Sequence, residues 1–283
     1  AGYVQLDAQD GGVVEILYFG LIPAFRGRRI GTLGAAVLLL TAFVAVELRT
    51  ASPLLRPGLL RGRPVLTANL FCLLLASAQF GAFYFVSLYM QLVLGYGPTA
   101  AGFAFLPFCV GVVAGAILAT RAVAVLGIRR LMAVGGTLAA LGMGWFAATA
   151  TVDGSFLASI LGPSLLCSLG IGLCFVPLGT AATTDVVPGE TGMASGLLNS
   201  SRQVGGSLGL AVLVTVAAQV TGGGTGTRDL SAGYAAAFWV AAGLLAAAAL
   251  AAYVLLPGES RAAGGPVAGE SVAAEHEGDA AAR

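Results

Sequence analysis

The stretch GMASGLLNSSRQVGGSLG, residues 192–209, decides the fold of this chain because it carries polar side chains inside an apolar run. The run continues to about Val220 and is therefore long enough to cross a bilayer as a helix. A stripe of polar and small residues in such a helix should face protein or a water-filled cavity rather than lipid. At helical spacing this stripe consists of Ser195, Asn199, Arg202, Gly206 and Gly209.

The composition is that of a membrane protein. Of the 283 residues, 58% are hydrophobic and only 10% are charged, and the mean hydropathy is +0.92. A soluble domain carries about 25% charged residues. The net charge is +1 and the sequence has no basic patch, so nucleic acid is not an expected partner.

The sequence lacks the residue patterns of an enzyme or a metal site. No cluster of His, Asp and Glu suits a metal, and no Gly-rich loop follows a strand to hold a phosphate. The single histidine, His276, lies in a polar tail. The cysteines lie in apolar runs, where they are expected to be packing residues: Cys72, Cys109, Cys167 and Cys174. We therefore predict no catalysis, no metal and no cofactor.

The apolar runs predict an all-α membrane protein. Six runs are long enough to span a bilayer: 67–94, 101–125, 131–151, 155–178, 192–220 and 234–256. A shorter run at 32–46 predicts one extra transmembrane helix, followed by a cytoplasmic connector up to residue 66. Residues 1–31 form an irregular N-terminal segment, and residues 257–283 read as a disordered tail.

The distribution of arginine predicts the orientation. The connectors at 49–66 and 121–130 are rich in Arg, whereas the connectors at 95–100, 151–154 and 219–232 hold only Arg228. The positive-inside rule then places the first group, the 179–191 connector and the C-terminal tail in the cytoplasm. The expected location is the cell membrane, with several passes. Arg26, Arg28 and Arg29 fall on the opposite side in this scheme.

Three motifs carry a resemblance to a known family: LGYGPTAAGFAFLP at 94–107, LATRAVAVLGIRR at 118–130, and the stretch at 192–209. In this order and spacing they resemble the C-terminal half of the fourteen-helix drug:proton antiporters of the major facilitator superfamily. The resemblance implies a C-terminal six-helix bundle, residues 67–256, with one preceding transmembrane helix. It also implies efflux of hydrophobic or amphipathic drugs or metabolites by alternating access, coupled to protons. Where that family often has an Asp-Arg pair, this chain has Ala124 and Val125.

Arg202 allows two interpretations. It could border the translocation route, where it would bind substrate or face a carboxylate on a neighbouring helix. Alternatively, it could extend toward the cytoplasm and hold two helices together through loop carbonyls or Asp185. Burial of an unpaired Arg at mid-membrane costs at least about 2.5–3.5 kcal/mol, so a partner is expected in both cases.

A second polar face lies in the run at 67–94, where aromatic and hydrogen-bonding side chains recur at helical spacing. Asn69 and Gln79 are weaker candidates in the same run. The predicted substrate pathway is Tyr84, Ser87, Gln91, Asn199, Arg202 and Gln203. Four-residue spacing predicts close helix packing at Gly111, Gly115, Gly192, Gly196, Gly205 and Gly209.

The six later spans contain no Asp or Glu in their interiors, although proton coupling usually needs an intramembrane carboxylate. The chain also begins with Ala1 rather than Met. We therefore expect part of a longer reading frame, with a missing N-terminal half as partner alongside the lipid bilayer, a small hydrophobic substrate and protons. The alternative is a truncated protein that does not transport, or a half-transporter that needs a separate N-terminal half.

Overall fold

The computed structural model describes residue 41, residues 62–184, 186–187 and 189–256. Apart from Thr41, all of these belong to one compact unit that begins at Pro57. Most of the predicted extra helix at 32–46, the segment 1–31, the predicted partner Asp185 and the tail at 257–283 lie outside the described residues.

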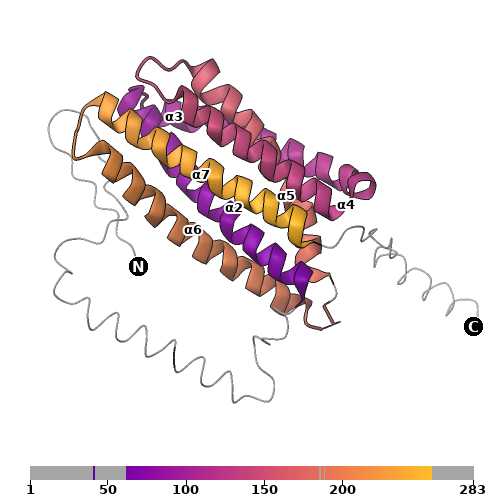
Figure 1. Cartoon of the computed structure of the whole chain (residues 1–283). Helices are drawn as coiled ribbons and strands as arrows, with labels where there is room; N and C mark the ends of the chain where they lie inside the picture. Colours follow the sequence, from indigo (N-terminus) through magenta and orange to yellow (C-terminus); the bar gives the residue numbers. More distant parts are fainter. Residues whose placement is uncertain (1–40, 42–61, 185, 188, 257–283) are drawn as a thin grey trace, which may run out of the picture. The chain divides into compact units, whose positions relative to one another are not determined.

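All regular structure in the described part is helical, and five helices are long and apolar enough to cross a membrane. This confirms the prediction of an all-α membrane protein. The helices lie side by side, with α2 between α6 and α7 and with α4 and α5 beyond them (Figure 1). In chain order the elements are α2 (Arg63–Leu88), η3 (Tyr89–Val93), α3 (Pro98–Ala104), α4 (Leu106–Thr149), η4 (Phe156–Leu161), α5 (Gly162–Thr183), α6 (Thr191–Thr221) and α7 (Thr227–Leu255).

Helix α4 contains two of the predicted spans, which meet at Gly127. This residue has φ 73° and ψ 164°, a backbone conformation that is essentially restricted to glycine. In a straight helix Gly111 and Gly142 would lie about 47 Å apart. Both instead lie against neighbouring residues of α5, Ser168 and Cys167 respectively. The chain therefore reverses at Gly127, and the two arms of α4 form the separate spans that the sequence predicts.

Glycines bring α5 into close contact with both arms of α4. A Cβ on Gly115 would overlap the backbone of α5 at Leu169 and Gly172. On the second arm, a Cβ on Gly142 would overlap the backbone of Cys167. Helix α5 is thus held between the two arms by contacts that leave no space for a side chain.

Helices α2 and α6 run parallel and meet along a seam in which four pairs of facing residues are each 132 positions apart. The hydroxyl of Ser201 donates a hydrogen bond of 2.8 Å to Asn69 Oδ1. One turn further on, a Cβ on Gly205 would overlap the backbone of Leu73. In the same register Ser77 lies against Gly209, and Gly81 lies against Leu213. Ser77 also donates a hydrogen bond to the Gly205 carbonyl, one turn earlier on α6.

The packing glycines fall into two groups. Gly111, Gly115, Gly205 and Gly209 lie at close helix contacts. Gly192 and Gly196, in contrast, are exposed, and no described atom lies within 4 Å of the position of a Cβ. Within the described residues, these two therefore make no close helix contact, and their expected packing role stays a prediction. They occupy the first turns of α6, before the seam with α2 begins.

One predicted boundary also differs. The Gly- and Thr-rich composition of residues 221–230 predicts a loop, and the apolar run begins only at Tyr234, but α7 already begins at Thr227. Asp229 lies in its first turn, where a carboxylate interacts favourably with the helix dipole. This polar first turn of α7 has no apolar pattern, and hydropathy alone therefore misses it.

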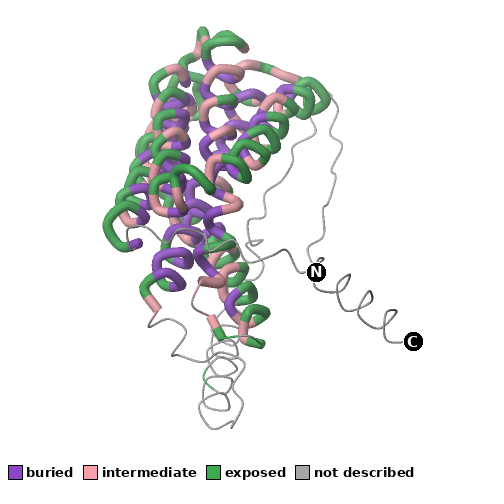
Figure 2. The backbone as a smooth tube through the Cα atoms, turned by 90° about the vertical axis from the view of Figure 1, so that its right-hand side faces the viewer, coloured by how far each residue is buried: buried purple, intermediate pink, exposed green. Residues whose placement is uncertain are grey.

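The outer faces of the helices carry large apolar side chains. Val110 is 65% exposed, Leu208 is 59% exposed and Leu250 is 64% exposed. Buried positions follow the faces that the helices turn toward one another (Figure 2). Apolar surface of this extent is unusual on a soluble monomer and suits contact with lipid.

The α2–α6 seam predicts opposite effects for two alanine substitutions on one helix. Gly205→Ala should destabilise the protein by about 1–3 kcal/mol, because the methyl group would overlap the Leu73 backbone. Gly196→Ala should be neutral or stabilising, because alanine is the better helix former by about 1 kcal/mol. The measurement is size-exclusion chromatography of the detergent-solubilised protein after heating, and the midpoint is the temperature at which half of the monodisperse peak is lost. Equal midpoints for the two variants would contradict the seam.

The reversal at Gly127 predicts a different cause of destabilisation. Gly127→Ala should cost about 1–3 kcal/mol through backbone strain, although no described atom would touch the new methyl group. Gly144→Ala on the same helix is the control, because its nearest neighbour, the Trp239 ring, would lie at an ordinary 3.5 Å. The same thermal assay applies, and a Gly127→Ala variant as stable as the control would argue against the strained reversal.

Candidate substrate cavity

A cavity of about 160 Å³ lies between α2, α5 and α6. It occupies a place where α5 and α6 make few contacts, whereas α2 contacts α6 along the seam. Polar side chains from two helices and apolar side chains from three helices meet there. The lining consists of Cys72, Leu75, Ala76, Gln79, Phe175, Leu178, Gly179, Ser195, Leu198, Asn199 and Arg202.

Helix α6 contributes the polar stripe that the sequence predicts. Ser195, Asn199 and Arg202 all line the cavity. The other two members of the stripe lie further along the helix and pack on α2, Gly206 under the Phe80 ring and Gly209 against Ser77. One face of α6 is therefore divided into a cavity-lining part and a packing part.

Helix α2 adds Gln79 as a further polar group, together with the thiol of Cys72. The Cys72 Sγ lies 3.6 Å from the Leu198 carbonyl of α6, so it also belongs to the contact between these helices. The sequence marks Gln79 only as a weak candidate and Cys72 as a packing residue. Their position beside Arg202 depends on the register between α2 and α6.

Helix α5 supplies an aromatic wall that the sequence analysis misses. Phe175, Leu178 and Gly179 line the cavity on either side of Pro177, which lies inside the helix. Proline has no N–H to donate to the carbonyl of Leu173, and it perturbs the regular helix at this point. An internal proline followed closely by glycine is the sequence signal that could have indicated a wall of this kind.

The guanidinium of Arg202 lies 5.8 Å from the centroid of the Phe175 ring. It makes no hydrogen bond or ion pair with any other residue that the structure describes. Arg202 lies about 17 Å along α6 from Thr191, which is close to the middle of this 31-residue helix. A cation–π contact contributes about 0.5–2 kcal/mol. That is less than the cost of about 2.5–3.5 kcal/mol for an Arg at the bilayer centre, so the cavity itself must supply water or an anion.

The remaining predicted pathway residues lie elsewhere. Tyr84, Ser87 and Gln91 are partly buried on α2 and η3 but do not line the cavity. Gln91 Nε2 donates a hydrogen bond of 2.9 Å to Ser87 Oγ, so these two side chains contact each other. Gln203 is exposed, and it too is absent from the lining. Of the six predicted pathway residues, only Asn199 and Arg202 therefore line the cavity.

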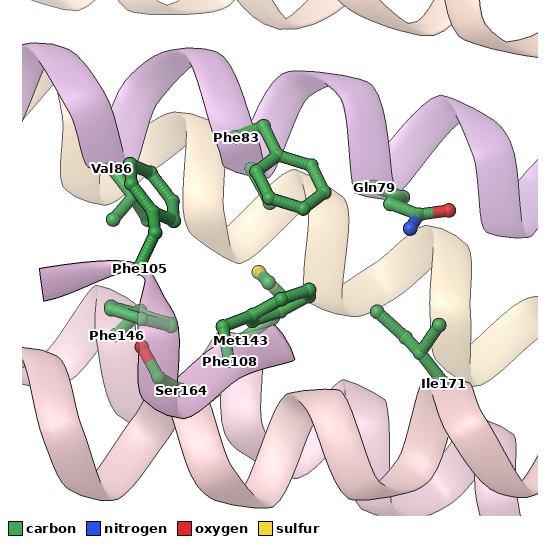
Figure 3. A pocket seen from close by; sticks show the side chains of 10 residues that line it. Gln79, Phe83, Val86, Phe105, Phe108, Met143, Phe146, Ser164 and Ile171 are labelled. Carbon is green, nitrogen blue, oxygen red and sulfur yellow. The ribbon is translucent and has the colours of Figure 1, made fainter. Parts of the chain in front are cut away.

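A second, apolar pocket with a volume of about 10 Å³ lies between α2, α4 and α5. Figure 3 shows the side chains that line it. Aromatic rings of α2, of both arms of α4 and of the residue that precedes α4 surround it. Gln79 lines this pocket as well as the larger cavity. The labelled side chains are Gln79, Phe83, Val86, Phe105, Phe108, Met143, Phe146, Ser164 and Ile171.

Comparison with known proteins identifies the family. Residues 16–210 match the Major Facilitator Superfamily, a span that includes α2 to α5 and the N-terminal part of α6 with Arg202. This chain belongs to the Major Facilitator Superfamily. Because the superfamily consists of membrane transporters, the prediction that the chain is not an enzyme is confirmed.

Several relatives are named for drug export or drug resistance. A cephamycin export protein of Amycolatopsis lactamdurans is 40% identical over 208 residues, which are 73% of this chain and 42% of the relative. A puromycin resistance protein of Streptomyces alboniger is 34% identical over 269 residues, or 89% of this chain and 53% of the relative. A multidrug resistance protein B homologue of Mycobacterium tuberculosis (strain ATCC 25618 / H37Rv) is 31% identical over 68% of this chain and 34% of the relative. The chain spans about half the length of the curated relatives that it matches, or less.

Access of water to the cavity can be tested by cysteine labelling. In a variant without the native cysteines, Asn199→Cys should react with a membrane-impermeant maleimide, because position 199 lines the cavity. Val204→Cys should not react, because Val204 is apolar, 49% exposed and on the face of α6 opposite Arg202. The measurement is a gel shift of the protein in intact membranes, and labelling of position 204 alone would show that the polar stripe faces lipid.

Proposed function

We propose that this chain forms the C-terminal half of a secondary active transporter that exports hydrophobic or amphipathic drugs or metabolites. Export would proceed by alternating access, with an N-terminal half provided by residues beyond this chain. The observation that carries the proposal is the cavity at Arg202, where an aromatic ring, apolar side chains and hydrogen-bonding groups surround one partly buried charge. The names of the relatives, which include a cephamycin export protein and a puromycin resistance protein, support the choice of substrate class.

Proton coupling is the finer part of the proposal. Within the described helices the only acidic residue is Asp229, in the first turn of α7. A carboxylate that carries protons across the membrane must be reachable from both sides, and the first turn of a helix does not satisfy that requirement. We infer that the proton-carrying acid belongs to the N-terminal half. The arginine distribution supports a cell-membrane protein with its C-terminal tail in the cytoplasm.

The second candidate is a truncated protein without transport, or a half-transporter that assembles with a separate N-terminal half. The observation that favours it is the partial coverage of the relatives, 42% and 53% for the two proteins named first above. The two candidates differ in whether the same gene encodes an N-terminal half upstream of this chain.

The test is drug uptake into inside-out vesicles that contain the full gene product around this chain. Acidification of the vesicle interior should drive uptake, and nigericin, which collapses the pH gradient, should abolish it. Uptake that persists with nigericin would contradict proton coupling. Vesicles with this chain alone should show no driven uptake, because its described spans lack a proton-carrying acid. Driven uptake by the chain alone would contradict the need for a second half.

A further inference from the structure

The cavity at Arg202 carries a positive charge and no negative one among its lining residues. Among its eleven lining residues Arg202 is the only charged group, and none is Asp or Glu. Three neutral polar side chains, Gln79, Ser195 and Asn199, stand around the same space. Beside apolar walls that partly shield Arg202 from water, a single cation attracts an anionic group and repels a second cation more strongly than it would in bulk water.

The size of the cavity limits what can enter. Its volume of about 160 Å³ is close to that of an engineered cavity of about 150 Å³ that holds one benzene molecule. The walls contributed by Leu75, Phe175 and Leu178 are apolar and suit a ring or a short aliphatic body. The space therefore suits one ring-sized group and not a complete large drug.

The geometry of the donors indicates which anion fits. A guanidinium presents a planar set of N–H groups that binds a carboxylate through two parallel hydrogen bonds. The amides of Asn199 and Gln79 and the hydroxyl of Ser195 can donate to the same carboxylate or to a neighbouring polar atom. The Phe175 ring, 5.8 Å from the guanidinium, holds the cation from one side and leaves its N–H groups available.

We propose that the cavity at Arg202 binds the carboxylate of an amphipathic compound whose adjacent ring-sized apolar body lies against Phe175 and the leucines. This inference rests on the proposed export function in one respect: the bound compound is taken to be the transported substrate. The cavity should bind anionic compounds more tightly than neutral ones, and neutral compounds more tightly than cationic ones.

The test measures binding to the whole chain in nanodiscs of zwitterionic phosphatidylcholine. Three probes share one body and differ in charge: 4-(trifluoromethyl)benzoate, 4-(trifluoromethyl)benzamide and 4-(trifluoromethyl)benzylamine. Fluorine NMR line broadening, corrected with empty nanodiscs for partition into lipid, gives the dissociation constants. The benzoate should bind about tenfold more tightly than the benzamide, and the benzylamine should bind most weakly.

Variants separate Arg202 from a general effect of charge. Arg202→Gln should weaken benzoate binding about tenfold, to the level of the benzamide, and leave benzamide binding unchanged. Arg228→Gln is the control, because it removes the same charge at an exposed position in the first turn of α7. Asn199→Asp adds a carboxylate beside Arg202, makes the cavity neutral overall and should therefore abolish the preference for benzoate over benzylamine. It provides an independent test should Arg202→Gln fail to fold.

Several results would overturn the inference. These are equal affinity for the three probes, benzoate binding that survives Arg202→Gln, and an unchanged order in Asn199→Asp. Loss of benzoate binding when phosphatidylglycerol is added to the nanodiscs would also overturn it, because a lipid headgroup would then be the occupant. If the vesicles show proton-driven uptake but the three probes show no charge preference, the proposed preference for anionic substrates is contradicted and the export function is not. If the benzoate binds as expected but the vesicles show no driven uptake, the export function is contradicted and the anion site is not.

Discussion

The close contact between helix backbones at glycine is the constraint on which the rest of this structure depends. In lipid there is no hydrophobic force between helices, so association relies on van der Waals contact and hydrogen bonds. The α2–α6 seam provides both, since the Gly205 backbone meets that of Leu73 and Ser77 donates to the Gly205 carbonyl. The α4–α5 contacts at Gly115 and Gly142 follow the same principle.

The cavity exists because this tight contact is selective. Helix α6 follows α2 closely over several turns, but it touches α5 at few places. Between them, the perturbed segment of α5 around Pro177 faces the polar stripe of α6. Helix α6 packs closely on α2, and α5 packs closely on α4. The cavity at Arg202 therefore forms among α2, α5 and α6, where α5 and α6 do not fill the space between them. Its contents are then set by side chains and not by the backbone.

The sequence predicts the spans well because each depends on local hydropathy, and it predicts the α6 stripe because helical periodicity is local too. It fails where the answer depends on the register between helices. Tyr84 and Gln91 recur at helical spacing, which makes them attractive candidates for a polar face. The way α2 is aligned with α6 instead places Gln79 and Cys72 in the same cavity as Arg202. The spacing of Gly192 and Gly196 likewise resembles that of Gly205 and Gly209, but only the second pair meets another helix.

The seam also fixes the direction of the charge. Arg202 precedes Gly205 by three residues, which is a rotation of about 300° around the helix, so its side chain lies about 60° from the line of contact with α2. Because Gly205 is held against Leu73, α6 cannot rotate to move the guanidinium toward lipid without losing the seam. The seam therefore keeps the Arg202 guanidinium directed at the cavity, where water or an anion can solvate it, whether or not an anion is bound.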